Sequence, residues 1–407
     1  MLSGKIKLET ESSIRMKFLW VIAITLFFVV NMNYVFKTSS IIWYGTLLLL
    51  VAAYVLSFNG RIMFSNLSFF KWAISFLIFG CVSMLWCLSE SFAFDVIKSQ
   101  IINIVALFLI LFSLNYGFKF STLLKCYFVA TLFNAVYILL TIDVSQLGEV
   151  QVGTNLIEGW NGNGIGFMAT QGAIIGVYLF RETTFKFEKL IITLGIIFLA
   201  FLSAYTGSRT AFIVLILGFI VYYWMCNPKK AVKNVILTAL VVFCALYVIM
   251  NVEGFYNVLG KRFEGLFSLF TGKGEADTSS MLRDKFIENG KKWFLDKPLF
   301  GYGLNNYKVL NLRATGEMTY AHNNFIEIAV DLGIVGLIWY YAPFLVLAVK
   351  LLLSYKKGNI NIYLFVSLII SVVSHYGTVS YYGFYQNFIL LLCFYVVDKM
   401  KEKQIDD

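Results

Sequence analysis

The chain has 407 residues, of which 59% are hydrophobic, 18% aromatic and only 14% charged. A soluble globular protein carries about 25% charged residues, so a soluble core, a disulfide scaffold, a disordered chain and a DNA-binding domain all fit badly. The formal net charge of +10 has an explanation without nucleic acid, because Lys and Arg collect in the cytoplasmic loops of membrane proteins. These values predict an integral membrane protein that crosses the bilayer many times.

Apolar runs long enough to cross a bilayer recur along the chain. They predict about twelve spans, at residues 18–36, 41–58, 70–88, 100–116, 121–142, 164–180, 189–205, 210–226, 235–250, 326–349, 360–375 and 382–397. The first run follows basic residues and lacks a clear cleavage site, which favours an uncleaved helix over a signal peptide. The predicted fold is all-α: one polytopic transmembrane helical bundle that forms a single integral membrane domain over residues 1–407.

The basic residues indicate the orientation of this bundle. With a cytoplasmic N-terminus, 20 of the 33 Lys and Arg residues fall in inner segments, whereas the short outer loops hold only Lys37, Lys98 and Arg209. This bias predicts that both termini are cytoplasmic. The six cysteines contain no C-x-x-C pair and have no histidine nearby, so neither a disulfide framework nor a zinc site is expected.

Residues 251–325 form the one long connection, between the ninth and tenth predicted spans. Long translocated loops escape the positive-inside bias, so we expect a large periplasmic loop that contains helices. Its aromatic-rich part, residues 254–270, is expected to lie along the outer membrane interface. Ser279 or Ser280 is predicted to cap a helix that runs to about Leu295 and stops before Pro298, and residues 298–307 are predicted to form a turn.

Two arginines on the predicted outer face are candidates for anion binding. Arg209 opens the eighth span, either as an interfacial arginine whose charged head reaches water or as a guanidinium that pairs with phosphate or diphosphate. Arg283 lies in the first turn of the loop helix, where a cation opposes the helix dipole. The plain alternative for Arg283 is an exposed side chain beside Asp284.

His322 is one of two histidines in the chain and lies where the long loop re-enters the membrane. A neutral imidazole can accept a hydroxyl proton at pH 7; the alternative is a histidine satisfied at a helix cap. Glu327 and Asp331 follow in the first turns of the tenth span, as candidates to orient the histidine or a sugar. For His375, the other histidine, we expect a structural role.

Metal catalysis finds little support in the sequence. The chain has no H-E-x-x-H, its outer segments have no D-x-D, and residues 275–277 (Glu-Ala-Asp) are expected to be solvated loop. We therefore expect no metal and no cofactor.

Four features, in this order, resemble the O-antigen polymerase and O-antigen ligase superfamily of membrane glycosyltransferases. They are Asn-Gly-Asn-Gly-Ile-Gly at 161–166, Thr-Gly-Ser-Arg-Thr-Ala at 206–211, the helix with Arg283 that leads to Asp-Lys-Pro-Leu-Phe-Gly-Tyr-Gly at 296–303, and His322-Asn-x-Phe-Ile-Glu327 followed by Gly333 and Gly336. The resemblance covers about residues 155–345. It implies a GT-C-like bundle in the bacterial inner membrane, with an active site that faces the periplasm.

The chemistry that the resemblance implies is inverting, metal-independent transfer of a glycan from undecaprenyl diphosphate to an acceptor hydroxyl. Carried onto this sequence, it implies that Arg209 and Arg283 hold the leaving diphosphate and that His322 is the general base. The remaining expected substrate-binding residues are Asn163, Arg262, Tyr320, Asn323 and Glu327. We expect Arg209, Arg283 and His322 to line one outward-facing cavity.

Polymerases and ligases of this superfamily share the same machinery and differ in their acceptor. A polymerase extends a lipid-linked repeat unit, whereas a ligase delivers the finished glycan to lipid A-core; we favour the polymerase, while capsule polymerases and protein O-oligosaccharyltransferases look similar. Expected partners are the lipid-linked oligosaccharide, membrane lipid, a chain-length-regulating co-polymerase and a flippase. A different class, a lipid-linked oligosaccharide flippase or other transporter, predicts mid-membrane charges and broken helices. A non-catalytic scaffold is a third hypothesis.

Overall fold

The computed structural model describes residues 2–32, 40–57, 65–115, 117–141, 162–261, 264 and 278–406, and this part of the chain is all-helical. The helices in the predicted spans are α1 (Leu2–Met32), α2 (Ser40–Ser57), α3 (Ser68–Val82), α4 (Glu90–Asn115), α5 (Phe120–Thr141), α6 (Gly162–Glu182), α7 (Lys186–Tyr205), α8 (Arg209–Cys226), α9 (Ala231–Asn251), α14 (Asn324–Leu353), α15 (Asn359–Ser374) and α16 (Phe384–Asp406). Each of the twelve predicted spans thus falls on a helix.

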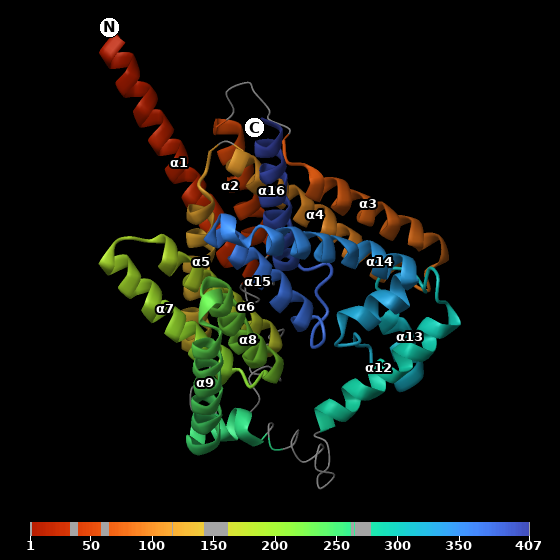
Figure 1. The fold of residues 1–407 in the computed structure, drawn as a ribbon. Helices are drawn as coiled ribbons and strands as arrows, with labels where there is room; N and C mark the ends of the chain where they lie inside the picture. The colour runs from red at the N-terminus through yellow and green to blue at the C-terminus, as the bar shows by residue number, and fades with distance from the viewer. Residues whose placement is uncertain are drawn as a thin grey trace.

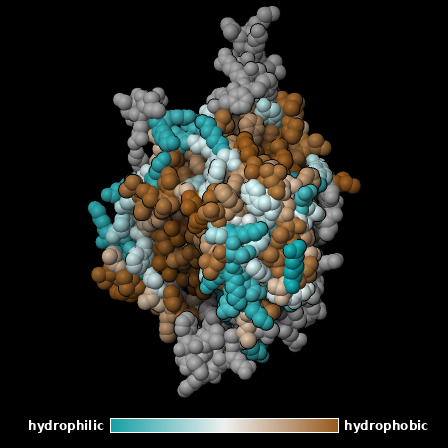
Figure 2. All heavy atoms as spheres, turned by 90° about the vertical axis from the view of Figure 1, so that its right-hand side faces the viewer, coloured by the Kyte–Doolittle hydropathy of each residue, from teal (hydrophilic) through white to brown (hydrophobic). Residues whose placement is uncertain are grey.

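These helices form a polytopic membrane bundle. Among the described residues, eight helices are long and apolar enough to cross a bilayer, and shorter apolar helices occur at Met16–Met32, Ile41–Ser57 and Asn359–Ser374. Apolar side chains cover much of the face shown in Figure 2. The exposed apolar residues of the bundle include Ile78 on α3 and Leu345 on α14. The two chain termini lie at one end of the molecule, away from α12 and α13 (Figure 1).

The long connection contains α10 (Glu253–Phe255), a π-helical turn (Tyr256–Gly260), α12 (Thr278–Asp296) and α13 (Tyr307–Thr315). Helix α12 is the predicted loop helix, and it ends just before Pro298 because proline has no N–H to continue it. Its start was predicted wrongly: it begins at Thr278, so Ser279 and Ser280 lie inside its first turn. Residues 262–263 and 265–277, which include Arg262 and the Glu-Ala-Asp stretch, lie outside the described residues.

Helix α14 is interrupted at Gly333, whose φ of 65° and ψ of −167° are not helical. The turn that follows α12 places its backbone in this break. Main-chain hydrogen bonds of 2.8–3.3 Å join the two, from Tyr302 N–H to Val330 C=O, from Gly303 N–H to Asp331 C=O, from Ile334 N–H to Pro298 C=O and from Val335 N–H to Leu299 C=O. The loop therefore satisfies backbone groups that an unbroken helix would satisfy itself.

The carboxylate of Asp331 holds the next part of the same turn. It accepts hydrogen bonds from the N–H groups of Asn305 (2.9 Å), Asn306 (2.9 Å) and Tyr307 (2.7 Å) and from the hydroxyl of Tyr381 (3.1 Å). Four bonds are about what one carboxylate can accept. The expectation that Asp331 orients a histidine or a sugar was therefore wrong: it anchors the loop on the bundle.

Candidate active site

Arg209 is the first residue of α8, and the residue before it fixes this helix end. Ser208 is the N-cap: its Oγ accepts the N–H of Ala211 at 3.2 Å and donates to Oδ1 of Asn163 on α6 at 2.7 Å. Gly166 permits this approach, since a Cβ there would lie 2.7 Å from the Cβ of Ala211. Two of the sequence features, at 161–166 and 206–211, are thus in direct contact around Arg209.

His322 lies between rings from two different segments. Its ring centroid is 6.2 Å from that of Phe286 on α12, nearly parallel at 13°, and 4.1 Å from that of Tyr320. Its φ of 53° is uncommon for a residue other than glycine. Because Arg283 precedes Phe286 by about one turn of α12, the loop helix brings its arginine to the histidine.

Burial and, as the smaller cause, the positive charge of Arg283 together lower the pKa of His322 from 6.5 to about 4. The imidazole is consequently neutral at pH 7 and keeps a lone pair. Neither ring nitrogen forms a hydrogen bond with a described residue, and Nδ1 is buried. The guanidinium of Arg283 therefore lies close enough to His322 for its charge to act on the imidazole.

Glu327 and Asn323 hold the backbone on either side of His322. The carboxylate of Glu327 is fully buried, and its Oε2 accepts the N–H of Ala321 at 2.6 Å. Asn323 is the N-cap of α14, where its Oδ1 accepts the N–H groups of Phe325 (3.0 Å) and Ile326 (3.1 Å). Both residues were predicted to bind substrate; in the structure these oxygen atoms position the histidine segment.

The turn between α15 and α16, residues 375–383, connects the Arg209 region with the His322 region. A Cβ on Gly377 would lie 2.8 Å from the side chain of Thr210, next to Arg209. On the other side, Oδ1 of Asn324 accepts the N–H groups of Ser380 (2.9 Å) and Tyr381 (3.0 Å). The Arg209 and His322 segments therefore contact the same turn, although they are far apart in sequence.

His375, in this turn, has partners on both ring nitrogens. Nδ1 is 3.0 Å from the hydroxyl of Tyr341, and Nε2 is 3.1 Å from Oε1 of Gln386. The side chain is also completely buried. These contacts fit the structural role that the sequence suggested for His375.

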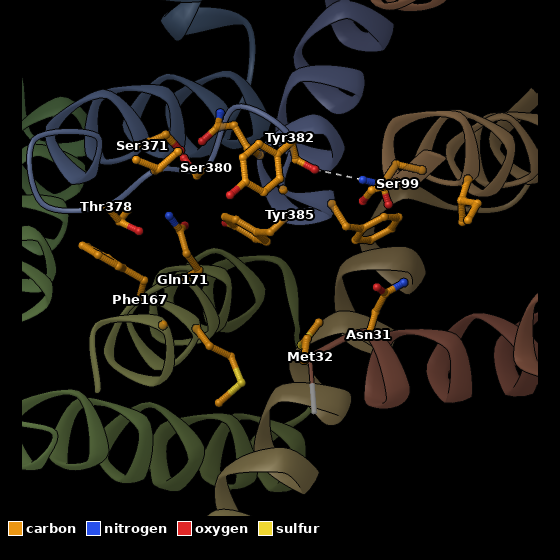
Figure 3. Close-up of a pocket in the computed structure, with 18 of the residues that line it drawn as sticks. Asn31, Met32, Ser99, Phe167, Gln171, Ser371, Thr378, Ser380, Tyr382 and Tyr385 are labelled. Atoms are coloured by element: carbon orange, nitrogen blue, oxygen red, sulfur yellow. Dashed lines mark hydrogen bonds between the residues drawn. The ribbon is translucent and has the colours of Figure 1, made fainter. Parts of the chain in front are cut away.

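A cavity of about 800 Å³ lies beside this turn, among α1, α2, α4, α5, α6, α15 and α16 (Figure 3). Its wall includes Tyr320, whose ring contacts His322, and Gly164, the neighbour of Asn163. None of Arg209, Arg283 and His322 lines it, so the expectation of one cavity lined by all three does not hold for this cavity.

The part of the chain that the structure describes contains no group of three or more His, Cys, Asp or Glu side chains that could hold a metal ion. Polar groups gather instead around the loop, the turn at 375–383 and the helix ends next to them. The fold and the site together define a helical membrane protein whose candidate chemistry rests on arginine and histidine side chains at one end of the bundle.

Comparison with known families agrees with this arrangement. Residues 194–341 match the family model Wzy_C, described as O-antigen ligase, and the chain carries this family's domain, which makes it a membrane glycosyltransferase. The matched region includes Arg209, Arg283, His322 and Glu327, so the resemblance seen in the sequence is confirmed. No curated protein sequence matches the chain.

Proposed function

We propose that this protein is an O-antigen repeat-unit polymerase of lipopolysaccharide biosynthesis. It transfers the growing glycan from undecaprenyl diphosphate to a hydroxyl of an incoming lipid-linked repeat unit, with inversion and without a metal ion. The observation that carries the proposal is the neutral His322 imidazole beside Arg283, within a matched glycosyltransferase domain. This combination offers a proton acceptor and a cation at one place, as displacement of a diphosphate requires.

In the proposed reaction, the acceptor oxygen attacks the anomeric carbon from the face opposite the diphosphate. The new C–O bond forms as the bond to the diphosphate oxygen breaks, and the leaving diphosphate takes the electron pair. Arg209 and Arg283 neutralise the charge that develops on it. The acceptor's proton passes to a ring nitrogen of His322, which supplies the lone pair.

Binding of the donor strengthens the base in this scheme. A pKa near 4 makes His322 a weak base in the free protein, and the positive charge of Arg283 contributes to that low value. A bound diphosphate would offset this charge and favour imidazolium, because an anion nearby raises the pKa of a histidine. His322 would then accept a proton most readily when the leaving group is in place.

Asn163, Arg262 and Tyr320 remain proposed contacts of the substrate. Asn163 lies beside Arg209 through its bond to Ser208, and the ring of Tyr320 lies between His322 and the cavity wall. We place the site on the periplasmic side of the inner membrane with both termini in the cytoplasm, as the charge bias predicts. A chain-length-regulating co-polymerase and a flippase are the proposed protein partners.

A ligase is the second candidate, because the matched family is described as O-antigen ligase. A flippase is less well supported, although α14 has the kind of break that transporters often show. The turn after α12 fills that break, and Asp331 is satisfied by hydrogen bonds to the turn and to Tyr381. The break therefore serves to attach the loop.

A gel of lipopolysaccharide from a deletion strain tests the proposal. We expect lipid A-core that carries one repeat unit and no longer chains, since a missing polymerase still permits ligation of single units. Core without any repeat unit, together with accumulated carrier-linked polymer, would instead identify a ligase. A normal ladder would overturn both assignments, and a plasmid copy of the wild-type gene is the control.

The pH dependence of transfer tests the pairing of Arg283 with His322. Since Arg283 lowers the pKa of His322, Arg283→Gln should raise this pKa and move the acid limb of the kcat/KM profile to higher pH. The same variant should also lower the maximal rate, because it removes a cation from the leaving group.

Lys285→Gln is the matched control for this measurement. It removes an exposed cation from the same helix, and its acid limb should coincide with that of the wild type. An unchanged acid limb in Arg283→Gln would contradict the pairing.

A further inference from the structure

Several buried polar side chains in the wall of the cavity lack partners. Buried side-chain atoms of five cavity-lining residues form no hydrogen bond with a described residue: Asn31, Ser371, Ser380, Tyr385 and Gln386. Gln171 on α6 is only 3% exposed and forms no hydrogen bond with a described residue. Figure 3 shows the Gln171 amide pointing toward the hollow that Ser380 and Tyr385 also face.

Burial of such polar groups costs free energy unless a partner forms hydrogen bonds with them. A buried amide or hydroxyl without a partner costs about 1–3 kcal/mol, so a hollow lined by several of them suits a ligand rich in donors and acceptors. An alkyl chain would leave these groups unpaired. The volume of about 800 Å³ lies within the usual range of ligand pockets.

The charged residues and the aromatic rings of the cavity wall limit the kind of ligand that the cavity suits. Among the described residues, the charged side chains in the wall are Asp95 and Lys98, which lie one turn apart on α4 and have opposite charges. This wall does not suit a diphosphate, whose candidate arginines lie elsewhere. Aromatic faces that sugars can stack on are supplied by Trp43, Tyr44, Tyr320 and Tyr382.

The cavity also adjoins both halves of the candidate active site. Its wall reaches Tyr320, whose ring lies 4.1 Å from that of His322. The wall also includes Gly164, next to the Asn163 that bonds to Ser208. A ligand in the cavity could therefore extend to the general base and to the Arg209 helix end.

We propose that this cavity is a glycan-binding subsite that holds uncharged, hydroxyl-rich sugars of the lipid-linked substrate, with Gln171, Ser371, Ser380, Tyr385 and Gln386 as its hydrogen-bonding residues. The identity of this glycan rests on the proposed function. The sugars belong either to the donor or to the acceptor, and the experiment below separates the two.

The test measures binding to the purified full-length protein in lipid nanodiscs. The probe is the oligosaccharide that mild acid releases from lipid-linked repeat units of the deletion strain. We expect Tyr385→Phe and Gln171→Met each to raise its Kd about 3- to 10-fold, the usual weight of one or two hydrogen bonds. Undecaprenyl diphosphate without sugar should bind equally well to the wild type and to both variants.

Tyr222→Phe is the matched control. The hydroxyl of Tyr222 is also buried and has no partner among the described residues, but Tyr222 does not line the cavity, so its loss should leave the Kd unchanged. Unaltered oligosaccharide binding in both cavity variants, no saturable binding to the wild type at millimolar concentration, or weaker binding of undecaprenyl diphosphate alone would each overturn the proposal.

Two-substrate kinetics then assign the sugars to the donor or the acceptor. A raised KM for one lipid-linked substrate in Tyr385→Phe identifies the substrate whose sugars occupy the cavity, and a change in neither KM would contradict the subsite. Failure of the subsite proposal and failure of the polymerase proposal would give different results. A protein that delivers glycan to lipid A-core would overturn the polymerase assignment while the binding result stands.

Discussion

Replacement of His322 by glycine is expected to abolish long-chain glycan while the protein accumulates at its normal level. Loss of a general base typically lowers a rate by about 10²–10⁴-fold, which is enough to remove the upper ladder. Glycine is the informative choice here because the φ of His322 is 53°, a conformation that glycine adopts without cost. Relief of the backbone strain offsets part of the lost ring packing and of the chain entropy that glycine adds to the unfolded state, so the variant should remain folded.

Two further measurements separate chemistry from folding at this position. Thermal unfolding of the purified variant should stay one cooperative transition close to the wild-type temperature, and added imidazole should restore part of the transfer rate by occupying the space beside Phe286 and Tyr320. His322→Ala should lose as much activity, and because it keeps the positive φ it should be less stable than His322→Gly by about 1–2 kcal/mol. A normal ladder from both variants would remove His322 from the mechanism.

Replacement of Gly333 by alanine is expected to be the most damaging single-methyl change in the described structure. A Cβ there would lie 2.2 Å from the carbonyl oxygen of Leu299, so it would push the inserted turn out of the break. The backbone conformation itself costs about 1–3 kcal/mol for a residue other than glycine. Displacement of the turn adds the loss of several hydrogen bonds at about 1 kcal/mol each.

We therefore expect Gly333→Ala to destabilise the protein by more than about 3 kcal/mol, with loss of the folded peak in size-exclusion chromatography. Gly316→Ala is the control: Gly316 also has a positive φ, of 78°, but a Cβ there meets nothing within 4 Å. It should cost only about 1–2 kcal/mol and keep transfer activity. Equal stability losses in the two variants would show that the turn does not hold the break.

His322 and Gly333 lie in different parts of one assembly. The turn after α12 is fixed in the broken helix by backbone bonds and by Asp331, and α12 carries Arg283 to His322. The predicted loss of function on destroying the break therefore does not require any contact between Gly333 and substrate. It follows from the loss of the loop's position on the bundle.

Much of the helical organisation could be predicted because hydropathy is a local property. A span needs about 20 consecutive apolar residues, so each predicted span falls on a helix, and Pro298 marks the end of α12. The site residues were nominated for the same kind of reason: Arg209, Arg283 and His322 are rare residue types in an apolar chain. Glu327 and Asn323 were nominated too, but their bonds to the neighbouring backbone could not be read from composition.

The sequence by itself thus determined that this is a polytopic helical membrane protein, because a bilayer constrains every span locally, and that residues 194–341 carry a Wzy_C domain. Only the tertiary structure decided that α14 breaks at Gly333 to receive the turn after α12, that Asp331 anchors this turn, and that Gln171, Ser371 and Tyr385 meet in one cavity. The physical reason is that these features depend on hydrogen-bonding groups from distant segments. A hydrogen bond between two distant segments produces no hydrophobic periodicity in the sequence of either segment.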